Sequence, residues 1–184
     1  MRTKLRRLIY LTGLLLYSIP VQFFISAPLS AQSDRDILKA AYIERITRFV
    51  EWPQVNKIKD TSIFTIGVYG DREFEDVLKI AYGKRTIKGK SVEIKKIVTI
   101  EQIESCDICY VSDKMKDIIG NIVTAANNYG VLLMSEAKDF GINGVHFNFY
   151  IENDKLRFEI NKKSLDSGRF KTSSLLMMNV KIIQ

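Results

Sequence analysis

The sequence is poor in the residues that most enzymes use for chemistry, with one histidine, His146, and only two cysteines. One histidine cannot supply a multi-histidine metal site, and no acidic residues around it have the spacing of a ligand set. No G-x-S-x-G nucleophile motif, P-loop or dinucleotide-binding glycine pattern occurs. A Ser–His–acid triad stays formally open because serines and aspartates are common. We therefore predict no catalytic residue, no metal and no cofactor.

The two cysteines, Cys106 and Cys109, form a C-x-x-C motif, which in redox proteins normally opens a helix. Here residues 105–111 have the composition of a strand or its entry. Residues three apart in a strand lie roughly 10 Å apart and point to opposite faces, whereas a disulfide needs Cα atoms within about 7 Å. We expect two reduced, largely buried thiols. A turn at this place would allow a bridge, and an envelope thiol-redox protein stays the less favoured alternative.

Basic residues exceed acidic ones, but the excess is concentrated at the N-terminus. The net charge is +7, four of the cations precede residue 8, and no acid precedes Asp34. Without residues 1–31, the chain has 24 basic and 21 acidic residues, a balance of +3. The most basic stretch, Lys84–Lys96, has no stacking aromatic residues among its cations, so it lacks the usual footprint of a nucleic-acid binder. We expect no nucleic acid among the partners.

The first 31 residues have the layout of a secretory signal peptide. Residues 2–7 are basic, residues 8–25 are almost wholly apolar, and residues 26–31 are mostly small. We predict cleavage after Ala31, which leaves residues 32–184 as one folded domain outside the cytoplasm. An uncleaved membrane anchor is the alternative, although the apolar segment barely reaches the length of a span. Four residues interrupt it: Gly13, Ser18, Pro20 and Gln22.

The remainder of the chain alternates helical and strand patterns, which predicts an α/β fold with a mixed β-sheet flanked by helices. Helices are expected at 34–50, 73–81 and 115–126, and strands at 63–68, 92–98, 108–111 and 131–134. The apolar face of the first helix is assigned to Leu38, Tyr42, Ile46 and Phe49. The last segment, 173–183, is expected to close the core as a helix. Its run Leu175–Met178 is assigned to the core rather than to an apolar partner site.

The clearest pattern is a C-terminal antiparallel hairpin with a two-residue turn at Asn153-Asp154. It predicts three facing apolar pairs: Ile151 with Leu156, Phe149 with Phe158, and Phe147 with Ile160. The apolar residues then share one face and the polar residues the other, so a slip by one residue would destroy the match. We predict a half-buried hairpin whose polar, solvated face includes His146.

Six segments, taken in order, resemble the YfiR family. They are Phe49–Pro53 (FVEWP), Ile66–Asp71 followed by Phe74, Gly83–Lys90 (GKRTIKGK), Cys106–Ser112, Arg157–Asn161 (RFEIN) and Ser173–Leu176. The resemblance extends from about residue 37 to residue 183. One departure is Gly144–Phe147, where the family has Gly-Gly-Met-Ile. Relatives whose stability depends on disulfides have more cysteines, so disulfide control is not expected here.

This resemblance implies a periplasmic α/β protein that binds other proteins and catalyses nothing. Relatives repress a membrane-bound diguanylate cyclase by binding its periplasmic part. An outer-membrane lipoprotein can sequester the repressor, which releases cyclic-di-GMP synthesis and biofilm formation. Members can be dimers, so a homodimer is one expected assembly.

The partner expected for this chain is an inner-membrane sensor, either a diguanylate cyclase or a histidine kinase. The alternative function is a periplasmic sensor module that binds a small aromatic or anionic ligand. The partner itself is not conferred by the fold, because function depends on the site that a fold carries.

Five residues are candidates for a partner-binding surface. Glu51 and Trp52 end the first helix, and tryptophan is a common interface anchor, with a core position as the alternative. Arg157, Glu159 and Asn161 share the polar face of the hairpin. That row is either a docking surface or a solvated face whose charges protect against edge pairing.

Overall fold

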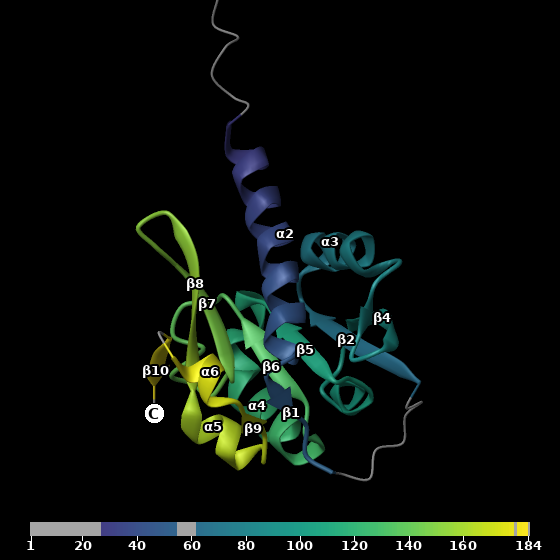
Figure 1. The fold of residues 1–184 in the computed structure, drawn as a ribbon, viewed down its shortest axis with the longest axis vertical. Coiled ribbons are helices and arrows are strands. Elements are labelled where there is room, and N and C mark those ends of the chain that lie inside the picture. The colour runs from purple at the N-terminus through teal and green to yellow at the C-terminus, as the bar shows by residue number, and fades with distance from the viewer. Residues whose placement is uncertain (1–26, 55–61, 179, 184) are drawn as a thin grey trace, which may run out of the picture. The chain divides into compact units, whose positions relative to one another are not determined.

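Five neighbouring parallel strands form the centre of an eight-stranded mixed sheet (Figure 1). The computed structural model describes residues 27–54, 62–178 and 180–183, and residues 35–184 form one compact unit. The predicted α/β class with a mixed sheet is confirmed. The predicted signal segment lies almost wholly outside the described residues. No helix within the described ranges is long and apolar enough to cross a membrane.

The strand order of the large sheet is β10-β8-β7-β6-β5-β2-β4-β3. The central strands β4, β2, β5, β6 and β7 are parallel to their neighbours, whereas β7–β8 and β3–β4 are antiparallel and β10 is parallel to β8. A separate two-stranded sheet pairs β1 with β9. The strands are β1 (Val50–Glu51), β2 (Ile63–Tyr69), β3 (Thr86–Ile87), β4 (Lys90–Ile97), β5 (Ile108–Val111), β6 (Leu132–Ser135), β7 (Phe147–Glu152), β8 (Lys155–Asn161), β9 (Lys171–Thr172) and β10 (Lys181–Ile183).

Helices cover both faces of the large sheet and define two apolar cores. Helices α2 and α3 contribute Ile43 and Leu78 to the first core, and α4 contributes Ile122 to the second. Gly130 ends α4 in the left-handed conformation, which glycine adopts readily. The helices are α2 (Ala27–Thr47), α3 (Arg72–Tyr82), α4 (Ile119–Tyr129), α5 (Lys162–Ser167) and α6 (Ser174–Met177), with 3₁₀ helices η1 (Glu101–Ser105) and η2 (Asp113–Ile118).

A buried lysine fixes α2 to the sheet. The Lys39 side chain is 0 % exposed, and its Nζ lies 2.8 Å from Asp36 and 2.6 Å from Glu136, at the end of β6. The same ammonium group donates to the Tyr110 hydroxyl at 3.3 Å and lies 4.6 Å from the centre of the Phe74 ring. Burying an ammonium group is costly unless carboxylates compensate its charge, and here two of them do.

The predicted apolar face of α2 is confirmed at Ile46 and is wrong at Leu38. Leu38 is exposed, while Tyr42 and Phe49 are only half-buried at the edge of the core. The buried face consists of Asp36, Lys39, Ala40, Ile43, Ile46 and Thr47. The pattern of apolar residues could not reveal this face because the Lys39 ion pairs bring polar side chains into it.

The hairpin has the predicted register, but its second face is not solvated. The three predicted apolar pairs are present, and Asn153 and Asp154 both have positive φ, as a tight hairpin turn requires. The segment after β6 covers the polar face: the Asn148 side chain donates to Ala137 O at 3.1 Å and the Asn161 side chain to Gly141 O at 2.8 Å. Buried amides that find backbone acceptors are well tolerated in a core.

His146 belongs to this covered face and is fully buried. Its Nδ1 accepts from the Leu133 backbone N–H at 2.8 Å, and its Nε2 lies 2.9 Å from the Asn127 side-chain oxygen. Burial lowers the pKa of His146 to about 3, so the imidazole is neutral at physiological pH. The prediction of a solvated position for His146 is therefore wrong.

The C-terminal segment and the cysteines also differ from expectation. Residues 173–183 form one short helix, α6, and then β10, because Lys181 pairs with Glu159 at 2.7 Å and the β-branched residues after it extend the sheet. Cys106 and Cys109 are reduced and buried, as predicted, but both belong to the second core. The expected opposite orientation is wrong because β5 begins only at Ile108, so strand alternation does not reach Cys106.

Replacing Lys39 by methionine should cost about 3–5 kcal/mol of unfolding free energy, because the variant removes the cation that faces the buried Asp36 carboxylate and the more exposed Glu136. Urea unfolding measures the loss. The matched control Lys114→Met changes an exposed lysine and should stay within about 0.5 kcal/mol of the wild type. A loss below about 1 kcal/mol for Lys39→Met would contradict the anchoring role.

His146 should make the protein less stable in acid. The unfolded imidazole has a pKa near 6.5, so between that value and about pH 3 the unfolded chain binds more protons. The stabilisation is complete above pH 6.5 and is lost as pH falls through this window, by at most about 1.4 kcal/mol per pH unit. His146→Asn, which keeps an acceptor for Leu133, should unfold with a shallower dependence on pH. Equal slopes for both proteins would rule out this role.

Candidate functional site

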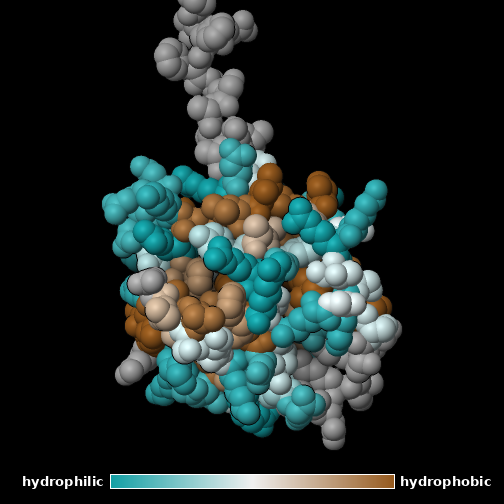
Figure 2. All heavy atoms as spheres, viewed as in Figure 1, coloured by the Kyte–Doolittle hydropathy of each residue, from teal (hydrophilic) through white to brown (hydrophobic). Residues whose placement is uncertain are grey.

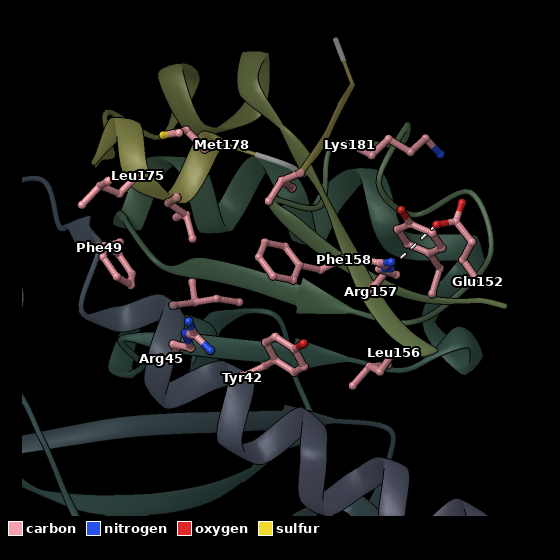
Figure 3. Close-up of a pocket in the computed structure, with 14 residues that line it drawn as sticks. Tyr42, Arg45, Phe49, Glu152, Leu156, Arg157, Phe158, Leu175, Met178 and Lys181 are labelled. Carbon is pink, nitrogen blue, oxygen red and sulfur yellow. Dashed lines mark ion pairs between the residues drawn. The ribbon is translucent and has the colours of Figure 1, made fainter. Parts of the chain in front are cut away.

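A groove of about 650 Å³ lies between α2, the β7–β8 hairpin, α6 and the start of β10 (Figure 3). Residues from three separate parts of the chain line it. They are Tyr42, Arg45, Ile46 and Phe49 of α2, Tyr150, Glu152, Leu156, Arg157 and Phe158 of the hairpin, and Leu175, Leu176, Met178, Val180 and Lys181 near the C-terminus. This set is called the C-terminal groove below.

The inward orientation of α2 decides which of its residues reach the groove. Lys39 and Ile43 point into the core, so Tyr42 and Phe49 lie one step around the helix, where residues three and four apart share a face. Arg45 lies on the same side and is exposed. The Lys39 ion pairs thus determine which side of α2 lines the groove.

The apolar wall of the groove is exposed. Leu175 is 67 % and Met178 is 63 % exposed, whereas Leu176 between them is buried. The assignment of the whole Leu175–Met178 run to the core is therefore wrong for two of its residues. Ser173 begins this turn by accepting from the Leu175 N–H at 3.3 Å. Figure 2 shows apolar residues gathered around the position of α6, among hydrophilic neighbours.

The centre of the groove is aromatic. Phe158 projects from β8 toward Tyr42 of α2, and their ring centres lie 5.8 Å apart in an edge-to-face arrangement (Figure 3). Phe149 lies 6.3 Å from Phe158 on the adjacent strand. Such aromatic surfaces give a large contact area with little loss of side-chain entropy when a partner binds.

The outer edge of β8 is only partly paired. Strand β10 pairs with residues 159–161, so no strand among the described residues pairs with the outer edge of residues 155–158. This stretch ends at Phe158 in the centre of the groove. An unpaired strand edge presents backbone N–H and C=O groups to which an extended segment can add as a further strand.

Basic side chains line the groove at both ends. Arg45, Arg157 and Lys181 line it together with one carboxylate, Glu152. Arg45 lies near Phe49, whereas Arg157, Lys181 and Glu152 lie at the opposite end (Figure 3). Arg157 Nε lies 3.7 Å from Glu152, and Lys181 Nζ lies 2.7 Å from Glu159. Arg45 has no ion pair among the described residues, so the surface retains an uncompensated guanidinium.

The predicted partner-binding residues separate into two places. Arg157 lines the C-terminal groove, but Glu159 and Asn161 are buried on the face of the hairpin that the segment after β6 covers. Asn161 accepts from the Ser164 N–H at 2.7 Å and begins α5, which is a structural role. The expected exposed row is therefore wrong for two of its three residues.

Glu51 and Trp52 lie in another shallow hollow of about 390 Å³, together with Arg169 and Lys171. The Trp52 Nε1–H donates to Asp107 O at 2.9 Å, and its ring packs edge-to-face against Phe64. Trp52 is half-buried and packs against the first core, so the core alternative describes it better than the anchor hypothesis. Glu51 is exposed at the side of this hollow.

The described residues form no group of three or more histidine, cysteine or acidic side chains that could hold a metal. Burial raises the pKa of Cys109 well above its usual value, which opposes formation of the reactive thiolate. The arrangement of the C-terminal groove is that of a binding surface, with an aromatic centre, exposed aliphatic side chains and a basic rim.

The chain belongs to the YfiR/HmsC-like family, whose model matches residues 36–180. This is a family of regulators rather than of enzymes. No curated protein sequence matches the chain. The family therefore supports a regulatory role and leaves the particular partner open.

Solved structures share the fold at low sequence identity. A conserved domain protein from Vibrio cholerae matches with a TM-score of 0.56 and 11 % identity over 81 % of this chain and 60 % of its own. CD0873, a substrate binding protein with adhesive properties from Clostridium difficile, matches with a TM-score of 0.51 and 14 % identity, over 66 % of this chain and 54 % of its own. An ABC domain from Streptococcus pneumoniae in complex with L-Trp matches with a TM-score of 0.54 and 12 % identity, over 80 % of this chain and 62 % of its own. The chain thus spans a little over half the length of these proteins.

Glu159 and Arg157 should differ sharply in their effect on stability. Glu159→Ala removes a buried carboxylate that accepts from Asn148 and Lys181, and should cost about 1–3 kcal/mol. Arg157→Ala removes an exposed side chain with one loose ion pair and should cost less than about 1 kcal/mol. Thermal or urea unfolding of both variants checks the contrast, and similar costs would contradict these positions.

Proposed function

We propose that this protein is a non-enzymatic periplasmic regulator that binds the extracytoplasmic part of an inner-membrane sensor through the C-terminal groove. The sensor is a diguanylate cyclase or a histidine kinase, and the protein controls its output. Family membership supports the regulatory class, and the N-terminal sequence supports export. The observation that carries the proposal is the exposure of Leu175 and Met178 beside the Phe158–Tyr42 aromatic pair.

The chemistry of the groove defines its occupant. Exposed aliphatic and aromatic side chains favour a partner segment with an apolar anchor, because burying that surface drives association. The basic residues Arg45 and Arg157 favour carboxylates beside that anchor. The edge of residues 155–158, with which no described strand pairs, favours an extended segment that adds a strand to β8. The occupant is therefore an extended, acidic segment with at least one large apolar side chain.

The test is affinity capture from detergent-solubilised envelopes, with and without cross-linking, followed by mass spectrometry. The tagged protein should retain a membrane cyclase or kinase, and Leu175→Glu and Met178→Glu should each lose it, because a carboxylate in the groove repels an acidic segment. Ile80→Glu is the matched control, since Ile80 is 86 % exposed on α3, outside the groove.

Unfolding curves for all four proteins establish that the groove variants remain folded. The proposal fails if no membrane sensor is retained, or if both groove variants retain the sensor as well as the wild type and Ile80→Glu do.

A further inference from the structure

The strand order creates a crevice at the carboxyl ends of two central strands. After β2, the chain enters α3, whose Phe74 and Leu78 pack in the first core. After β5, it enters η2 and α4, whose Ile119 and Ile122 pack in the second core, on the opposite face of the sheet. The two connections leave in opposite directions, so they part between the ends of β2 and β5. In open α/β sheets this point is where ligands bind.

A pocket of about 560 Å³ lies outside these strand ends. Its walls come from the turns that follow β2, β5 and β6, and its size is within the range of small-molecule sites. Its lining includes three carboxylates, two lysines and a serine: Asp71, Asp113, Asp139, Lys116, Lys138 and Ser112. Tyr110 and Glu136 also line the pocket. None of these residues lines the C-terminal groove. We call this second site, at the ends of β2, β5 and β6, the switch-point pocket.

A buried hydroxyl lies in the wall of the pocket. Ser112 is 7 % exposed, and its Oγ accepts weakly from the Lys114 N–H at 3.3 Å. Among the described residues, no group accepts the hydroxyl proton of Ser112. Gly70 has a φ of +88°, and a Cβ at this position would lie 2.6 Å from Ser112 Oγ. The glycine therefore leaves space beside the hydroxyl, and the proton remains free to bind a ligand oxygen.

Charges of both signs line this pocket without pairing. Lys116 and Lys138 face the same hollow as Asp71, Asp113 and Asp139, yet none of the five forms an ion pair within the part of the chain that the structure describes. Asp71 uses Oδ1 to accept from the Phe74 N–H. Glu136 differs, because Lys39 already holds it. A ligand that carries both charges can satisfy the two signs at once, whereas a simple anion or cation meets repulsion from one of them.

We propose that the switch-point pocket binds a small zwitterion, namely a free α-amino acid. The ammonium group of the ligand lies toward the carboxylates of Asp71, Asp113 and Asp139. Its carboxylate accepts from the Ser112 hydroxyl and from Lys116 and Lys138. Charge-assisted hydrogen bonds of this kind are the stronger class, so the two ends of the ligand provide most of the selectivity. The site is separate from the docking surface and does not depend on it.

Isothermal titration calorimetry of the purified protein with each of the twenty L-amino acids tests the site. Ethanolamine and lactate serve as controls, because ethanolamine carries only the ammonium charge of an amino acid and lactate only the carboxylate charge. At least one amino acid should bind at millimolar or lower concentration, and neither control should bind comparably. The double variant Lys116→Ala, Lys138→Ala should weaken binding about tenfold or more, whereas Lys84→Ala, which changes an exposed lysine outside the pocket, should leave it unchanged.

Three results would overturn the proposal: no amino acid binds at millimolar concentration, a singly charged control binds as well as the amino acid, or the double variant binds with wild-type affinity. Unfolding curves show whether the double variant is folded. If it is not, Ser112→Ala replaces it and should also weaken binding, because the ligand then loses the buried hydroxyl donor. Unchanged affinity in Ser112→Ala would equally overturn the proposal.

Discussion

The Lys39 ammonium group determines the position of α2, and α2 in turn shapes one wall of the C-terminal groove. A fully buried cation is stable here only because Asp36 and Glu136 lie within 2.8 Å and the Tyr110 hydroxyl accepts a further hydrogen bond. Glu136 follows β6 and Tyr110 belongs to β5, so the cluster ties the helix to the carboxyl ends of two central strands. With this side of α2 fixed inward, Tyr42, Arg45 and Phe49 line the groove.

Buried polar groups that satisfy one another also occur on the covered face of the hairpin. His146, Asn148, Glu159 and Asn161 are buried against the segment after β6, and each has a hydrogen-bond or ion-pair partner. Because both faces of the hairpin are covered near its base, only its tip and its outer edge remain for a partner. The C-terminal groove lies along that edge, where β10 stops short of residues 155–158.

Local patterns in the sequence were enough to predict most strands, the hairpin register and α3 to within one residue at each end. For α4 they predicted a helix over 115–126, whereas α4 begins at Ile119 and ends at Tyr129. They failed where long-range contacts reverse the usual preference of a side chain. The sequence around Lys39 is that of an exposed lysine, because its partner Glu136 is 97 residues away. Glu159 was predicted to be solvated because its partners Lys181 and Asn148 contact it only in the folded sheet. Leu175 and Met178 were assigned to the core because a helix of four residues is too short for its apolar pattern to distinguish exposed positions from the buried Leu176. Of the five predicted site residues, Arg157 alone lines the C-terminal groove.

The central claim is that the C-terminal groove is the surface that contacts a membrane sensor, and site-specific photo-cross-linking in living cells tests it most directly. A photoreactive residue at position 175 should yield a cross-link to the extracytoplasmic part of an inner-membrane cyclase or kinase, while the same residue at position 80 on α3 should not. Cross-linking to such a sensor from position 80 but not from position 175 would contradict the account.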